Sequence, residues 1–233
     1  IIALHSEARP IISALGLIKD PKSHPFPLYR DDLHNLVVSG TGSRRAAGAT
    51  GYLLGKGLSS TPCFLNLGIA GHGCLPPGTG FLGARIIGDQ EINAYYPPQI
   101  LQSELQRSTI RSVTKPITDY PEPIGYDMEA HSFYATASLG TSRELIQVLK
   151  VVSDNPQHSI NNIDNRQVTR LIEGILPDFL SISNQLDSMV KCFSPRTEEA
   201  SLNELAHSIH SFSQTQAHQL NKLFRHALSL IHI

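Results

Sequence analysis

Val148-Leu149-Lys150-Val151-Val152-Ser153-Asp154 joins an apolar run to a terminal acid. Its apolar part is short, rich in β-branched residues and bounded by polar ones, which predicts a buried strand. Asn155-Pro156 ends that strand directly after the acid. Because open α/β sheets bind their ligands at the carboxyl ends of parallel strands, we expect Asp154 at a ligand site.

A second acidic stretch, Tyr126-Asp127-Met128-Glu129-Ala130, comes earlier in the chain. Small and apolar residues follow Glu129 at helical spacing, through Phe133 and Ala137. This places a carboxylate at a helix N-terminus, where negative charge is favoured. The segment up to Asp154 is long enough for a helix that returns the chain to the same sheet edge.

Strand and helix patterns alternate through the first part of the chain, which predicts an α/β fold. Ile1–Leu4 is a strand candidate, a helical period begins at Ile11, and Glu7 stands between them. Ser39-Gly40-Thr41-Gly42 is a small-residue loop before a helix start, suited to a close ligand or to tight packing. Further strands are predicted over 33–38, 63–71, 81–87 and 109–113, and a short helix over 101–107.

The pattern changes towards the C-terminus. Residues 163–186 have the apolar spacing of a long helix, which Pro177 would kink or restart. Residues 187–233 contain no glycine and have amphipathic spacing, which predicts a helical hairpin. We therefore divide the chain into an α/β domain over 1–186 and a helical extension over 187–233, which packs either on its own domain or on a partner.

Composition excludes several functional classes. The chain has 233 residues, a formal net charge of −1 and no cluster of basic residues, which argues against nucleic-acid and membrane surfaces. The three cysteines lack CxxC spacing, so we expect reduced thiols and no metal site. No signal-peptide pattern is present, and the expected location is cytoplasmic. Motifs of P-loop, dinucleotide-binding, GxSxG and HExxH proteins are absent.

Four stretches together resemble the nucleoside phosphorylase/nucleosidase superfamily, and are most similar to methylthioadenosine/S-adenosylhomocysteine nucleosidases. They are Ala3–Glu7, Ser39–Gly42, Asn66–Gly71, and Asp127–Ala130 followed by Val152–Asp154. The resemblance implies a mixed central sheet flanked by helices. It also implies a small-molecule nucleoside as the ligand, a homodimer, and no metal or organic cofactor.

The resemblance implies a role for each matching residue. The catalytic residues would be Asp154, as the general acid that protonates the leaving base, and Glu7, which would orient the attacking water. Glu129 would bind the ribose hydroxyls. The other substrate-binding residues would be Met128 under the sugar, Asp127, Ser153 beside the acid, and Ala70 and Gly71 along the base.

This assignment is chemically coherent, because breaking an N-glycosidic bond builds positive charge on the sugar and negative charge on the base. A protonated acid neutralises the base, and anionic Glu7 and Glu129 favour the cationic sugar. The expected activity is hydrolysis of a purine nucleoside or a related N-riboside. Each carboxylate also has a structural alternative: Asp154 as a turn cap, Glu7 and Glu129 as first-turn helix acids.

The sequence departs from the family pattern in three places. Asn66-Leu67-Gly68-Ile69 lacks the arginine and hydroxyl that clamp phosphate in phosphorylases, which favours water as the nucleophile. Lys150 replaces the arginine usually found four residues before the catalytic acid. Residues 87–126 are shortened, and Tyr95, Tyr96 or Tyr120 would have to stack on the base. Two alternatives remain: phosphorolysis with phosphate as co-substrate, and a non-catalytic nucleoside-binding protein.

Overall fold

The computed structural model describes residues 1–59, 61–89, 93–159, 163–193, 213, 216, 219, 220 and 223. The chain divides into two compact units, Ile1–Val190 and Lys191–Ile233. Most of the helical hairpin predicted over 187–233 lies outside the described residues. Among the residues that are described there, 187–193 form the end of helix α5 (Leu176–Phe193), and residues 216, 219, 220 and 223 are also helical.

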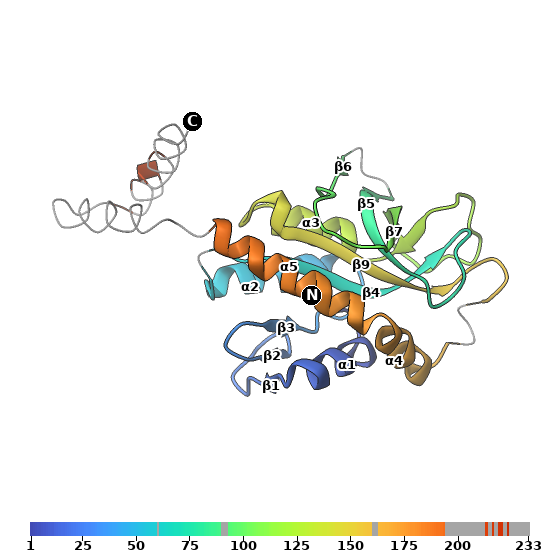
Figure 1. The fold of residues 1–233 in the computed structure, drawn as a ribbon, viewed down its shortest axis with the longest axis horizontal. Coiled ribbons are helices and arrows are strands. Elements are labelled where there is room, and N and C mark those ends of the chain that lie inside the picture. Colours follow the sequence, from blue (N-terminus) through green and yellow to red (C-terminus); the bar gives the residue numbers. More distant parts are fainter. Residues whose placement is uncertain are drawn as a thin grey trace. The chain divides into compact units, whose positions relative to one another are not determined.

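A mixed sheet forms the centre of the first unit (Figure 1). Its hydrogen-bonded order is β6-β5-β7-β8-β4-β9, and β5 also pairs with β9, so that β5, β7, β8, β4 and β9 form a closed ring. The β4–β9, β5–β7 and β7–β8 pairs are parallel, and the β4–β8, β5–β6 and β5–β9 pairs are antiparallel. The strands are β4 (Phe64–His72), β5 (Gly80–Gly88), β6 (Ala94–Tyr95), β7 (Gln106–Ser112), β8 (Gly125–Asp127) and β9 (Ile146–Asp154).

Strand β9 is buried along its whole length, as its continuous apolar run predicts. Its side chains alternate between two core clusters. Val148 and Val152 belong to one cluster, and Leu149 and Val151 belong to the other. Since side chains of a strand alternate, Lys150 falls on the same face as Val148 and Val152.

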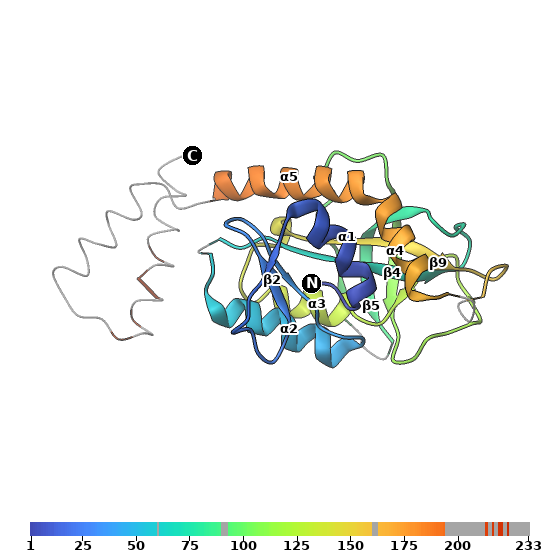
Figure 2. The same cartoon turned by 90° about the horizontal axis from the view of Figure 1, so that it is seen from below.

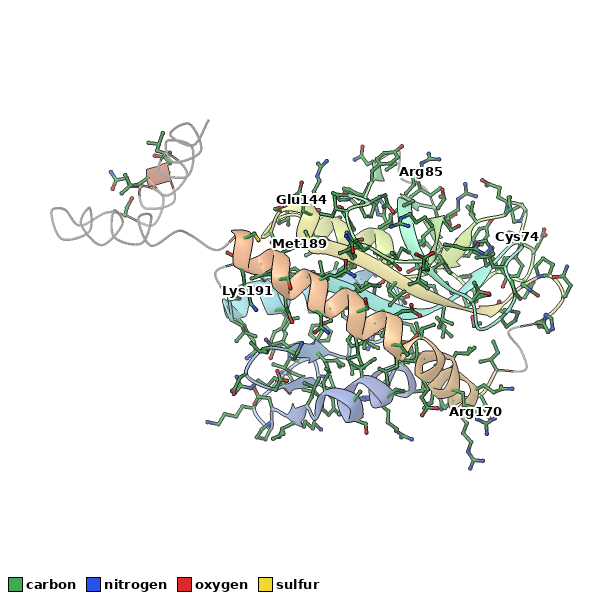
Figure 3. The ribbon with its side chains drawn as sticks, viewed as in Figure 1. Cys74, Arg85, Glu144, Arg170, Met189 and Lys191 are labelled. Atoms are coloured by element: carbon green, nitrogen blue, oxygen red, sulfur yellow. The ribbon has the colours of Figure 1, made fainter. Side chains whose placement is uncertain are left out.

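Helices cover both faces of the sheet, and the two core clusters lie between them (Figures 1 and 2). Helices α2 (Ser43–Lys56) and α3 (Ala130–Ala137) pack on one face. Helices α1 (His5–Leu15), α4 (Asn165–Gly174) and α5 (Leu176–Phe193) pack on the other. A 3₁₀ turn, η1 (Arg143–Leu145), leads into β9. Arg170 is exposed and extends from α4 away from the sheet (Figure 3).

A small antiparallel sheet of three strands precedes α2. It consists of β1 (Ile18–Lys19), β2 (Leu28–Arg30) and β3 (Asn35–Val37). The strand predicted over Ile1–Leu4 is reduced to single parallel bridges, in which Ile2 pairs with Val38 and Leu67.

Helix α1 begins at His5, earlier than the predicted start at Ile11, so the predicted start is wrong. Pro10 lies inside this helix and cannot donate a backbone hydrogen bond there. The structure compensates for that missing bond: the Thr169 hydroxyl of α4 donates to the carbonyl of Ser6, 2.9 Å away. This tertiary contact therefore satisfies the carbonyl that Pro10 leaves unbonded, and the helix can begin at His5.

One further helix prediction, over 101–107, is wrong, and the restart predicted at Pro177 is confirmed. Residues 101–105 are irregular, and Gln106 already belongs to β7, so the short helix over 101–107 is absent. Leu101 and Leu105 owe their helix-like spacing to separate contacts with the α1/α4/α5 core. The long helix over 163–186 is two helices, and Pro177 lies in the first turn of the second, where its lack of an N–H does no harm.

Candidate active site

Glu7 lies in the first turn of α1, and its carboxylate is held against β4. Oε2 accepts the backbone N–H of Leu4 at 2.8 Å, and Oε1 accepts that of Ile69 at 2.9 Å. Burial raises the pKa of Glu7, while the bonds from Ile69 and Leu4 and the charge of Lys150 oppose that rise. Glu7 is thus a first-turn helix acid with a fixed orientation towards the sheet.

Lys150 stands in the middle of β9, and its ammonium group lies among carboxylates. Its Nζ is 2.9 Å from Oδ2 of Asp127, and the two side chains are 1% and 0% exposed. Burial lowers the pKa of Lys150, but the charges of Asp127, Glu129 and Glu7 raise it more, so the net shift is upward. Lys150 is therefore a buried cation that pairs with Asp127 and feels the charges of Glu129 and Glu7.

Asp127 is bound by protein groups on both of its oxygens. Oδ1 accepts the Ser112 hydroxyl at 2.5 Å. Oδ2 accepts the backbone N–H of Ala130 at 2.8 Å and faces Lys150. These bonds tie the end of β8 to the start of α3 and to β9.

Glu129 occupies the N-cap position of α3, so the predicted helix start is confirmed. Its carboxylate, however, reaches a different helix: Oε1 accepts the backbone N–H of Gly42, the N-cap residue of α2, at 2.6 Å. Burial raises the pKa of Glu129 to about 7, which the charge of Lys150 opposes and that of Asp127 reinforces.

The loop Ser39–Gly42 lies beside the Asp127–Glu129 stretch. Besides the Gly42 bond, the Ser43 hydroxyl donates to the carbonyl of Met128 at 3.2 Å. The side chain of Met128 is half-buried between its two acidic neighbours. Two stretches far apart in sequence thus meet in the structure.

Asp154 ends β9, and its carboxylate is 1% exposed. It accepts two hydroxyl hydrogen bonds, from Ser153 to Oδ1 and from Tyr120 to Oδ2. Desolvation and the hydrogen bond to Asp154 raise the pKa of Tyr120, which keeps the phenol protonated as the donor.

The end of β4 connects Asp154 with the Glu7–Lys150 group. A Cβ on Gly68 would lie 3.0 Å from Oε1 of Glu7 and 3.5 Å from Nζ of Lys150, so a glycine fits this close approach. Gly71 is paired with Asp154, and the ladder is irregular between Ala70 and Gly71. Glu7 thus lies beside Lys150 in the middle of β9, while Asp154 stands four residues further on, at the carboxyl end of the strand.

Of the three tyrosines proposed to face the base, only Tyr120 contacts a predicted site residue among the described contacts. Tyr95 packs against the rings of His131 and Tyr134, at centroid distances of 5.1 and 5.3 Å. Tyr96 is 62% exposed. The loop around Tyr120 has no sequence periodicity, so spacing could not single this residue out.

Two histidines, His5 and His72, stand close in sequence to the predicted site residues Glu7 and Gly71. His5 is exposed at the start of α1. Nδ1 of His72 accepts the backbone N–H groups of Cys74 and Leu75, both at 3.2 Å, and Nε2 lies 3.0 Å from the Ser108 hydroxyl. His72 thus shapes the turn after β4, where exposed Cys74 is seen in Figure 3.

A cavity of about 140 Å³ adjoins the Tyr120–Asp154 contact. It is lined by Thr118, Tyr120, Asn155, Pro156, Gln157 and Ser159. Asn155 has its own protein partners, because its Nδ2 donates to the Leu75 carbonyl at 3.0 Å and its Oδ1 accepts two backbone N–H groups.

Within the described ranges, no group of three or more His, Cys, Asp and Glu residues is arranged to hold a metal ion. None of the helices in those ranges has both the length and the apolar character needed to cross a membrane.

The sequence matches no protein-family model and, at a significant level, no curated protein. Its structure resembles several solved nucleosidases. The 5′-methylthioadenosine/S-adenosylhomocysteine nucleosidase of Neisseria meningitidis, in complex with methylthio-immucillin-A, superimposes with a TM-score of 0.63 and 17% identity over 77% of this chain and 96% of that one.

Two further structures show the same likeness. The apo 5′-methylthioadenosine nucleosidase of Arabidopsis thaliana gives a TM-score of 0.64 and 16% identity over 79% of this chain and 93% of that one. The futalosine hydrolase of Helicobacter pylori gives 0.59 and 12% over 76% and 95%. The chain therefore has the fold of the methylthioadenosine/S-adenosylhomocysteine nucleosidases, which confirms the fold that the sequence resemblance implied.

Proposed function

We propose that this protein hydrolyses the N-glycosidic bond of a purine nucleoside or a related N-riboside. The observation that carries the proposal is that the carboxylates of Glu7 and Glu129 are buried near Lys150 of β9, the strand that ends in buried Asp154. Structures similar in fold include nucleosidases for methylthioadenosine and a futalosine hydrolase, which supports an N-riboside as the substrate.

Asp154 acts on the base in this proposal. As the bond between C1′ and the base nitrogen breaks, its electron pair moves to the base, and Asp154 donates a proton to a ring nitrogen. Ser153 holds the acid in place through its hydrogen bond to Oδ1. Ala70 and Gly71 line the base with backbone, because small side chains leave room opposite Asp154.

The two glutamates act on the sugar side. Glu7 orients the water whose oxygen adds to C1′ and accepts the proton that this water loses. Glu129 binds the ribose hydroxyls, Met128 lies under the sugar, and both anions favour the positive charge that develops there. We assign Asp127 to holding Lys150 and the start of α3, since protein groups bind both of its oxygens.

Two contacts favour water over phosphate as the nucleophile. The N-terminus of α2, an otherwise suitable anion site, already carries the Glu129 carboxylate on the Gly42 N–H. Asn66, where phosphorylases carry their phosphate-clamping arginine, is buried and donates its amide to the Ile1 carbonyl at 3.1 Å. An incoming phosphate would meet buried carboxylates here, which repel it.

One contact favours the alternative of a non-catalytic nucleoside-binding protein. The Tyr120 hydroxyl donates a hydrogen bond to Oδ2 of Asp154, the oxygen from which a leaving base would take its proton. The experiment therefore has to measure binding as well as cleavage.

The test measures the release of free base by chromatography. The substrates are adenosine, inosine, methylthioadenosine, S-adenosylhomocysteine and futalosine. Each is assayed with and without phosphate. We expect release without phosphate from at least one substrate. Asp154→Asn should lower its rate by about 10²–10⁴-fold, the usual contribution of a general acid.

Asp32→Asn, at an exposed site, is the matched control and should keep the wild-type rate. Thermal unfolding of Asp154→Asn checks that the buried substitution leaves the fold intact. Release that requires phosphate would identify a phosphorylase. Binding without release from any substrate would identify the non-catalytic alternative. The homodimer and the absence of a cofactor stay predictions. Light scattering of the purified protein tests whether it is a homodimer.

A further inference from the structure

We propose that the Tyr120 hydroxyl is a removable occupant of the leaving-base position, which substrate displaces from Asp154, so that Tyr120 sets the affinity for the base. This inference rests on the proposed role of Asp154. It concerns a single contact, the hydrogen bond from the phenol to Oδ2. A base nitrogen that takes a proton from that oxygen cannot lie there while the phenol does.

Tyr120 donates a hydrogen bond to Asp154 and also fills the space opposite it. A Cβ on Gly71 would lie 2.6 Å from the Tyr120 hydroxyl and 2.7 Å from a ring carbon. Gly71 is the residue paired with Asp154 and is predicted to line the base. The phenol thus lies over the glycine surface that a flat ring of a substrate would use.

The segment that carries Tyr120 is fixed at its ends and exposed between them. It joins β7 to β8 without regular structure. Arg111 Nη1 lies 2.5 Å from Oε1 of Glu122, and the Ile124 carbonyl accepts the Gly73 N–H at 3.0 Å. Residues 114–116, 118 and 119 are exposed, so few packing contacts oppose a movement of the middle of this segment.

Tyr120 also has space into which it can move. It borders the cavity of about 140 Å³ whose other side is formed by residues 155–157 and 159. Its remaining aromatic contact is an edge-on approach to Tyr126, with centroids 5.6 Å apart. A shift of the ring therefore breaks one strong hydrogen bond and no close-packed core.

Displacement costs the hydrogen bond between the phenol and the carboxylate. Tyr120→Phe removes that bond and keeps the ring. Because hydrogen bonds to charged groups are strong, we expect the KM for methylthioadenosine and the Kd for adenine, measured by calorimetry, to fall about tenfold. We expect kcat to change little. A structural role for the hydroxyl would instead raise KM or leave it unchanged.

Tyr96→Phe is the matched control, since Tyr96 is exposed and should leave KM and Kd unaltered. Glu122→Gln is a second variant that spares the phenol and weakens the anchor to Arg111, and it should lower Kd for adenine several-fold.

The outcomes separate this inference from the proposed function. If wild type releases no base from any nucleoside, the proposed function fails, but tighter adenine binding in Tyr120→Phe still supports displacement. An unchanged or weaker Kd in Tyr120→Phe overturns the inference even when base release is confirmed. Failure of both wild type and Tyr120→Phe to bind adenine or methylthioadenosine overturns it too.

Discussion

Lys150 neutralises a group of buried anions, so its replacement tests how the site is held together. Lys150→Met should lower the free energy of unfolding by about 3–5 kcal/mol, because Asp127, Glu129 and Glu7 would remain buried without their cation. Lys56→Met, at an exposed position on α2, is the control and should change stability little. Denaturant unfolding measures both. Equal effects of the two substitutions would contradict the buried charge group.

Glu129 gives stability a defined pH dependence. Its pKa is 4.5 before folding and about 7 after it, so the folded state holds this proton more tightly. The stabilisation is complete below pH 4.5 and is lost as pH rises through 7. Relative to Glu129→Gln, wild type should therefore lose up to about 3 kcal/mol between these limits, at about 1.4 kcal/mol per pKa unit.

The measurement is urea unfolding of wild type and Glu129→Gln across this pH range. Glu104→Gln, at an exposed site, reports the pH dependence common to the rest of the chain. A constant difference between wild type and Glu129→Gln would show that Glu129 ionises alike in both states.

At the scale of elements, the segment before β8 approaches the turn after β4 so closely that only glycine fits. A Cβ on Gly73 would lie 2.0 Å from the Glu122 carbonyl oxygen. Gly73→Ala should therefore lower the free energy of unfolding by about 1–3 kcal/mol. Gly51→Ala, inside α2 and meeting Thr136 only at 3.9 Å, should raise it by about 0.5–1 kcal/mol. Unfolding midpoints that move in the same direction would count against this geometry.

Elements with a marked local signal were the ones that could be predicted from the sequence. β9 was predictable because it is apolar on both faces, and the start of α3 because of its acidic N-terminus. The start of α1 was missed because Thr169, distant in sequence, replaces the bond that Pro10 cannot make. Only the last strand of the small sheet before α2 was predicted, because β1 and β2 are too short to carry a pattern.

The candidate site likewise has residues that the sequence could predict and contacts that it could not. Short motifs pointed to Asp154, Glu7 and Glu129, since each stands beside a strand or helix end. The contact of Tyr120 with Asp154 depends on the path of an irregular loop, and the pairing of Lys150 with Asp127 depends on strand register. Neither leaves a periodic signal in the sequence.

For the chain as a whole, the described residues place both core clusters in the first unit. Among the described residues, all members of these clusters and the apolar residues packed against them lie between Ile1 and Met189. A chain ending at Phe193 should therefore unfold in one cooperative transition, with its Tm within about 4 °C of the full chain, which corresponds to roughly 1 kcal/mol. Calorimetry tests this, and a non-cooperative transition would show that the removed residues support the fold.

The closed ring of strands has a consequence for synthesis on the ribosome. Among the described strands, β9 comes last in the sequence, and it pairs with both β4 and β5 to close the ring. A nascent chain that has not yet reached residue 146 leaves unpaired edges on β4 and β5, and such edges invite pairing with other chains. Translation that stalls before β9 emerges therefore produces the form most in need of a chaperone.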